Sequence, residues 1–157
     1  MKKLIFPFVI LGFLLTSCEN DDDVCVSGEA TPRLKIKFKS ADNKVLTLDS
    51  LYLDVDYGNN NILTVVRAAK VDSALIPIRV DDAGFTELYV RKTKKGSVSK
   101  IKLNYNTTSE YVSPACGFKR LYQKLTGTLE TANPVTKVEL NQNQIINENK
   151  AHLYLVF

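Results

Sequence analysis

The chain has 157 residues, of which 45% are hydrophobic and 24% are charged, and its formal net charge is +4. These proportions are typical of a globular chain that is long enough for one domain with a core of its own. The mild basic charge comes without the aromatic and basic signature of a nucleic-acid binder, so we expect no nucleic-acid partner.

The N-terminus begins with Met1, Lys2 and Lys3 and continues as an uncharged hydrophobic run of twelve residues, from Leu4 to Leu15. A membrane-spanning helix needs about 20 residues, whereas the hydrophobic part of a secretion signal has about 7–15. Pro7 also disfavours a permanent straight helix in this run. We therefore predict that residues 1–17 are a secretion signal.

The signal ends in Leu15-Thr16-Ser17-Cys18, which resembles the lipobox of bacterial lipoproteins. In lipoproteins, the cysteine thiol receives a diacylglyceryl group and cleavage falls just before that cysteine. The resemblance implies that Cys18 is the lipidation site and that the mature chain is held at the membrane by acyl chains. An ordinary secretory signal with an incidental cysteine is the alternative.

Residues 18–24 are predicted to form an acidic tether, because clustered like charges repel one another and keep a chain extended. Acidic residues directly after the lipidated cysteine also resemble the surface-export signal of Bacteroidota lipoproteins. That resemblance implies a lipid-anchored protein of the outer membrane, exposed at the cell surface; a plain spacer is the alternative. Without Lys2, Lys3 and the four acidic residues at 19–23, the net charge of +4 becomes +6. Anionic glycans or lipid headgroups are therefore the expected opposite charges.

Two cysteines remain after lipidation, Cys25 and Cys116. In an exported chain such a pair is more often bridged than free, so a disulfide is predicted; two buried thiols are the alternative. Two cysteines and a single histidine without ligand spacing do not form a closed metal site, and we expect no metal or cofactor.

Alternating hydrophobic and polar residues run through the chain from Arg33 onward and predict β-strands. The clearest strands are at 34–39, 51–57, 100–105, 136–140 and 151–157, and less regular ones are at 62–66, 75–80, 85–91 and 124–131. Turn signals separate them at 57–61, 81–84, 94–96 and 132–134. The pattern predicts one all-β domain over residues 25–157, an antiparallel β-sandwich with an immunoglobulin-like arrangement as one form. The best helix candidate is 117–125, where hydrophobic residues follow helical spacing.

Several segments together resemble a family of small uncharacterised lipoproteins from Flavobacteria and their Bacteroidota relatives. The matching segments are the lipobox with Cys18, the stretch Asp23-Val24-Cys25, the strand opening at 31–34, the segment 111–119 and the last strand with His152. The family carries no assigned activity, so the resemblance implies location and architecture only. Both Cys25 and Cys116 lie inside the shared motifs, which fits a structural bridge.

No catalytic arrangement is expected. His152 is the only histidine, and no orienting carboxylate is evident beside it, so a structural or surface role is predicted. Cys116 before Gly117 could suggest a nucleophile, but a disulfide explains it better. The residues between Asp54 and Asn59 lack the spacing of a calcium loop.

Three further patterns suggest surface roles. The basic cluster 91–95 predicts either an anion-facing patch or a solvated hairpin tip. Several tyrosines could stack on sugars or simply favour sheet faces: Tyr52, Tyr89, Tyr105, Tyr111, Tyr122 and Tyr154. Asp49-Ser50-Leu51 and Asp72-Ser73-Ala74 resemble the O-glycosylation motif of Bacteroidota exported proteins, which implies modification at Ser50 and Ser73.

From the sequence we expect a non-catalytic envelope lipoprotein that serves as a binding or accessory module for an envelope protein or a glycan. A structural or assembly subunit of an outer-membrane complex is the second expectation.

Overall fold

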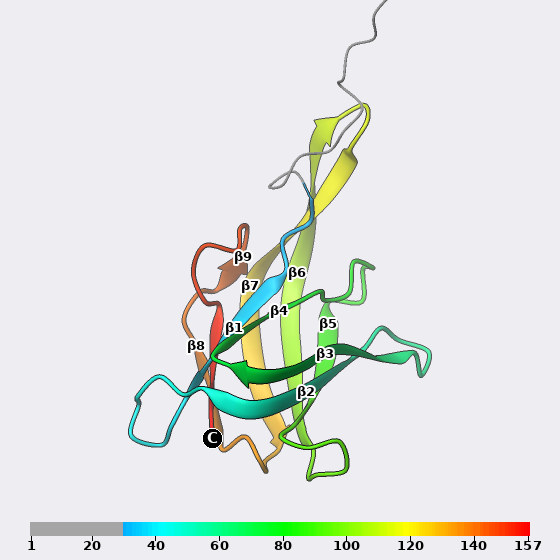
Figure 1. Cartoon of the computed structure of the whole chain (residues 1–157). Coiled ribbons are helices and arrows are strands. Elements are labelled where there is room, and N and C mark those ends of the chain that lie inside the picture. The colour runs from blue at the N-terminus through cyan, green and yellow to red at the C-terminus, as the bar shows by residue number, and fades with distance from the viewer. Residues whose placement is uncertain (1–29) are drawn as a thin grey trace, which may run out of the picture.

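A computed structural model describes residues 30–157, and this part of the chain is all-β (Figure 1). Ten strands form two sheets that pack face to face as a sandwich. The predicted fold class is therefore confirmed, although the sheets contain four and six strands instead of the four and three of a constant-type immunoglobulin domain. The predicted signal, the tether and the domain boundary at residue 25 lie outside the described residues.

The smaller sheet has the strand order β4-β1-β10-β8. Its strands are β1 (Leu34–Lys39), β4 (Ser73–Ile76), β8 (Lys137–Leu140) and β10 (Leu153–Val156). β1 and β10 are parallel, and the first and last strands of the described chain thus lie side by side at the centre of this sheet. The other two pairs are antiparallel.

The larger sheet has the strand order β3-β2-β5-β6-β7-β9 and is antiparallel throughout. Its strands are β2 (Leu48–Asp56), β3 (Ile62–Val71), β5 (Phe85–Arg91), β6 (Ser99–Ser113), β7 (Gly117–Thr131) and β9 (Gln144–Ile145). β6 and β7 have 15 residues each and form a long hairpin that projects beyond the rest of the sandwich (Figure 1).

The core lies between the sheets, where the hydrophobic residues of each alternating strand meet. Leu34, Ile36 and Phe38 of β1 are fully buried, whereas the lysines between them lie at the surface side of the small sheet. Leu51 and Leu53 of β2 are buried in the same core from the larger sheet. A shift of one residue would turn every such side chain to the wrong face, so this alternation fixes the register of the strands.

The helix predicted at 117–125 is wrong, because these residues belong to β7. Tyr122 and Leu125 are both buried although three positions separate them, and Lys124 between them has a left-handed backbone with φ of 53°. The register with β6 also shifts nearby, between Asn104 and Asn106. An irregularity of this kind inserts an extra residue into a strand and thereby imitates helical spacing in the sequence.

Candidate functional site

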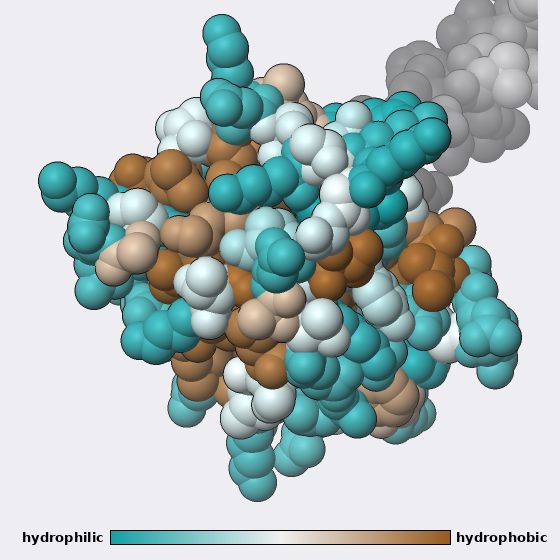
Figure 2. Space-filling model, turned by 90° about the horizontal axis from the view of Figure 1, so that it is seen from below, coloured by the Kyte–Doolittle hydropathy of each residue, from teal (hydrophilic) through white to brown (hydrophobic). Residues whose placement is uncertain are grey.

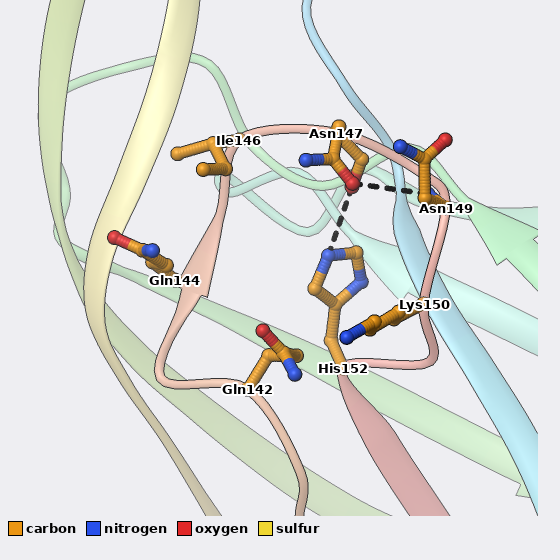
Figure 3. Close-up of a pocket in the computed structure, with 7 residues that line it drawn as sticks. All are labelled: Gln142, Gln144, Ile146, Asn147, Asn149, Lys150 and His152. Atoms are coloured by element: carbon orange, nitrogen blue, oxygen red, sulfur yellow. Dashed lines mark hydrogen bonds between the residues drawn. The ribbon is translucent and has the colours of Figure 1, made fainter.

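The segment that connects β8 to β10 gathers several polar side chains around the single histidine of the chain. It folds over the end of the small sheet and encloses a pocket of about 200 Å³ (Figure 3). The pocket, here called the 142–152 pocket, is lined by Gln142, Gln144, Ile146, Asn147, Asn149, Lys150 and His152.

His152 forms one wall of this pocket, and only 3% of the residue is exposed. Its Nδ1 accepts a hydrogen bond from the backbone N–H of Lys35 at 2.8 Å. Its Nε2 lies 3.0 Å from the backbone oxygen of Asn147, toward which the ring points (Figure 3). Because a backbone oxygen only accepts, Nε2 carries the proton and the ring is the neutral tautomer.

Burial lowers the pKa of His152 and outweighs the backbone groups of Asn147 and Lys35, which raise it. Both ring nitrogens are already engaged within the protein, so neither has a lone pair available for a substrate proton. The ring thus connects β1 to the loop before β10, which is a structural role.

Glu148 ties the same loop to the start of β1. Its carboxylate accepts hydrogen bonds from three groups of Arg33: the backbone N–H at 2.9 Å, Nε at 2.8 Å and Nη2 at 2.9 Å. Hydrogen bonding from Arg33 is the largest cause of the lowered pKa of Glu148. Lys35 adds a bond from Nζ to the backbone oxygen of Glu148 at 2.9 Å. The loop is therefore held by paired polar groups on one side of the pocket.

A second, larger depression of about 500 Å³ lies on the other side of this loop, between residues 30–33 and 146–149. Asn147 and Asn149 line both hollows. The sequence did not predict this constellation, because Arg33 and Glu148 are 115 residues apart and only the pairing of β1 with β10 brings them together.

The projecting end of the β6–β7 hairpin is a second region of interest. Tyr111 and Phe118 pack edge-on there, with ring centroids 5.4 Å apart, and are 55% and 69% exposed. Thr31 lies close to the same hairpin, since its Oγ1 accepts a hydrogen bond from the backbone N–H of Arg120 at 2.9 Å. The described chain therefore enters the fold beside the hairpin.

Cys116 lies in the turn of this hairpin, where its backbone N–H donates to Ser113 Oγ at 3.1 Å. Its predicted partner Cys25 and the predicted lipidation site Cys18 lie outside the described residues. The disulfide and the lipidation therefore stay predictions.

The other predicted surface sites are spread over the two sheets. Ser50 lies in β2 and its hydroxyl donates to the backbone oxygen of Lys92; Ser73 opens β4 and its hydroxyl donates to Asp72 at 2.9 Å. Asp54 pairs with Arg91, and Asp56 accepts a hydrogen bond from the backbone of Gly58. Modification of Ser50 and Ser73 stays a prediction.

Within residues 30–157, no cluster of three or more histidine, cysteine or acidic residues has the arrangement that a metal ion needs. The same part of the chain has no helix with the length and hydrophobicity that crossing a membrane requires.

The fold and the pocket together define a β-sandwich domain in which His152 connects β1 to the loop before β10. Residues 50–157 match the family of unknown function DUF6452, and the chain belongs to this family. The match begins within β2 and runs to the last residue. No curated protein and no solved structure matches the chain.

Proposed function

We propose that the protein is a lipid-anchored module of the bacterial cell envelope that binds or assists a partner and catalyses no reaction. The carrying observation is the sequence Leu15-Thr16-Ser17-Cys18 at the end of a twelve-residue hydrophobic run. The acidic residues after Cys18 and the resemblance to Bacteroidota lipoproteins support a place on the outer membrane. The engaged ring of His152 supports a role other than acid–base catalysis.

The place where the chain enters the fold indicates how the proposed lipid anchor would orient the domain on the membrane. Thr31 contacts Arg120 near the hairpin end, and the segment from Cys18 to Ala30 spans at most about 45 Å when fully extended. The lipid would therefore keep the hairpin end of the sandwich toward the membrane.

The proposed disulfide agrees with the same geometry. Cys25 is six residues before Thr31 and Cys116 is four residues before Arg120, while Thr31 and Arg120 are in contact. Six residues of extended chain reach about 20 Å, which is enough to bring Cys25 to the hairpin turn. Non-reducing peptide mapping of the mature protein should then yield one crosslinked peptide with both cysteines; two titratable thiols would contradict the bridge.

Palmitate labelling of the full chain in a bacterial host tests the anchor. We expect the wild type to incorporate label and Cys18→Ala to incorporate none and to accumulate as an unprocessed precursor. Cys25→Ala is the matched control and should label like the wild type. Equal labelling of the Cys18→Ala chain would overturn the proposal.

Protease added to whole cells tests the proposed surface location. If the acidic tether is an export signal, replacement of Asp21, Asp22 and Asp23 by Ala should protect the protein from protease. Unchanged sensitivity would leave the tether as a spacer only.

A structural subunit of an outer-membrane complex is the second candidate function. The exposed pair Tyr111 and Phe118 favours it, because projecting aromatic side chains often anchor protein interfaces. At the opposite end of the molecule, hydrophobic residues are interspersed with hydrophilic ones (Figure 2). A photoreactive residue at position 118 should then crosslink one defined outer-membrane protein, and the same residue at exposed Val45 should not.

A further inference from the structure

The outer face of the larger sheet carries an aromatic residue between two arginines. Tyr52 of β2 lies directly opposite Arg67 of β3 on one side and Arg91 of β5 on the other. Directly opposed residues project from the same face, with Cβ atoms about 5 Å apart. The Arg67 guanidinium lies over the Tyr52 ring, 5.5 Å from its centroid. We call Arg67, Tyr52 and Arg91 the basic row.

The charges around this row are only partly compensated. Arg91 pairs with Asp54, whose carboxylate also accepts a hydrogen bond from Thr64 Oγ1 at 2.6 Å. Arg91 Nη1 donates to the backbone oxygen of Lys94 at 3.2 Å and so holds the basic turn beside the row. Arg67 and Lys94 form no ion pair with any residue in the described range 30–157. Two positive charges are thus left over.

In the adjacent part of the same sheet, a lysine is neutralised by neighbouring carboxylates. Lys100 pairs there with Glu87 at 2.9 Å and with Glu130 at 3.1 Å, so one cation lies between two carboxylates. The charge of Lys100 is therefore neutralised within the sheet, whereas the charges of Arg67 and Lys94 have no carboxylate partner in residues 30–157.

A depression of about 460 Å³ opens at the basic row and is lined by Tyr52, Thr64, Arg67, Arg91 and Lys94. Its volume lies within the range of small-ligand sites, which is about 300–1,000 Å³. Guanidinium groups bind planar anions through paired hydrogen bonds, and Lys94 adds an ammonium group as a point charge. Tyr52 adds a half-buried aromatic surface against which a ring can pack.

We propose that this depression binds an acidic saccharide, with its anionic group between Arg67 and Lys94 and its sugar ring against Tyr52. The saccharide class follows from the combination of uncompensated cations with an aromatic side chain in one open depression. This inference deepens the proposed binding role and rests on it, but not on lipidation: failure of palmitate labelling would leave it intact.

Calorimetric titration of the full chain in detergent micelles at low ionic strength tests the proposal. The probe is tetragalacturonic acid, and the same oligosaccharide with methyl-esterified carboxylates is the neutral counterpart. We expect the acid to bind about tenfold or more tightly than the ester, because charge-assisted hydrogen bonds need the carboxylate. Inorganic sulfate should compete only at much higher concentration, since it cannot use Tyr52.

Two double variants distinguish binding at this depression from attraction by the overall positive charge of the protein. Arg67→Gln with Lys94→Gln should weaken binding of the acid about tenfold or more. Lys44→Gln with Lys124→Gln removes the same charge from exposed positions elsewhere and should leave the affinity within about threefold at this salt. Tyr52→Leu should weaken binding of the acid and leave competition by sulfate unchanged. Thermal unfolding of each variant verifies that it is folded.

Three results would overturn the proposal. Equal affinity for the acid and the ester would exclude recognition of the anionic group. Equal losses in the two double variants would assign binding to net charge alone. Sulfate that competes as strongly as the tetrasaccharide would exclude a saccharide site.

Discussion

Two clusters of polar side chains in this molecule use their charges in different ways. At the 142–152 pocket and on the other side of its loop, His152, Arg33 and Glu148 direct their hydrogen-bonding groups at one another or at nearby backbone. At the basic row, Arg67 and Lys94 have no acidic partner among residues 30–157. The polar groups of the first cluster are thus paired within the protein, whereas the second cluster has cations that can still bind an anion.

This difference indicates that the 142–152 pocket stabilises the fold, whereas the basic row is the better candidate for ligand binding. Enclosure and a histidine draw attention to the 142–152 pocket, yet its polar groups hold β1 and the β8–β10 connection together. The residues that line the depression at the basic row are half-buried or exposed, and none of them belongs to the hydrophobic core. We therefore expect mutations at the pocket to change stability and mutations at the basic row to change binding.

The largest effect is expected from His152→Ala. The substitution leaves the part-buried backbone N–H of Lys35 without its acceptor and opens space in the fold, which should lower the free energy of unfolding by about 2–3 kcal/mol. Lys150→Ala is the control, since this exposed residue lines the same pocket, and its change should stay within about 0.5 kcal/mol. Chemical denaturation measures both. Equal, small losses would mean that the pocket is not a structural connection.

The pH dependence of the free energy of unfolding also tests whether the neutral ring of His152 stabilises the fold. The folded pKa of His152 is lowered from 6.5, so the neutral ring stabilises the fold fully above pH 6.5 and this contribution is lost as the pH falls through the folded pKa. The free energy of unfolding should fall by up to about 1.4 kcal/mol for each pH unit in that window. Burial of the ring, which disfavours its charged form, is the largest cause of this direction.

The chain has a single histidine, so an NMR titration of the folded protein reports its pKa directly. Glu148 and Glu139 do not interfere between pH 7 and 5, because their folded pKa values are lowered from 4.5, that of Glu139 to about 2. A His152 pKa at or above 6.5 would contradict the buried, neutral ring.

The strands and the turns could be predicted from the sequence because alternation is a local property. The ranges 34–39 and 85–91 were predicted as observed, and the last strand differs by at most two residues at either end. The helix at 117–125 was predicted wrongly because the left-handed Lys124 places Tyr122 and Leu125 on one side of a strand. β9 was missed because two residues are too few to show a period.

The sites depend on strand order, which the sequence pattern does not contain. The basic residues at 91–95 were recognised as a candidate anion patch, but Arg67 was not, because only the pairing of β3, β2 and β5 brings it to Arg91 across Tyr52. Likewise, the contact of His152 with Lys35 needs the parallel pairing of β1 with β10.

Glu148→Gln should have a smaller effect than His152→Ala. Arg33 and Glu148 have side chains that are 49% and 31% exposed, and ion pairs in such positions contribute about 0–1 kcal/mol. We expect a loss of at most about 1 kcal/mol that shrinks further at high salt. Urea denaturation at two salt concentrations measures it. A loss larger than that of His152→Ala would make the ion pair, and not the histidine, the main connection of the loop.

Arg67→Ala should have the smallest effect on stability. Arg67 is exposed and forms no ion pair with residues 30–157; its contact with the Tyr52 ring is its one described interaction. A cation over an exposed ring contributes about 0.5–1 kcal/mol, and removal of one of several nearby positive charges relieves repulsion from Arg91 and Lys94. The two effects oppose each other, so we expect the free energy of unfolding to change by less than about 0.5 kcal/mol. Chemical denaturation of Arg67→Ala and Glu148→Gln under the same conditions compares the two changes in the free energy of unfolding. A loss above 1 kcal/mol would show that the basic row holds the sheet together, and the distinction between the two clusters would then fail.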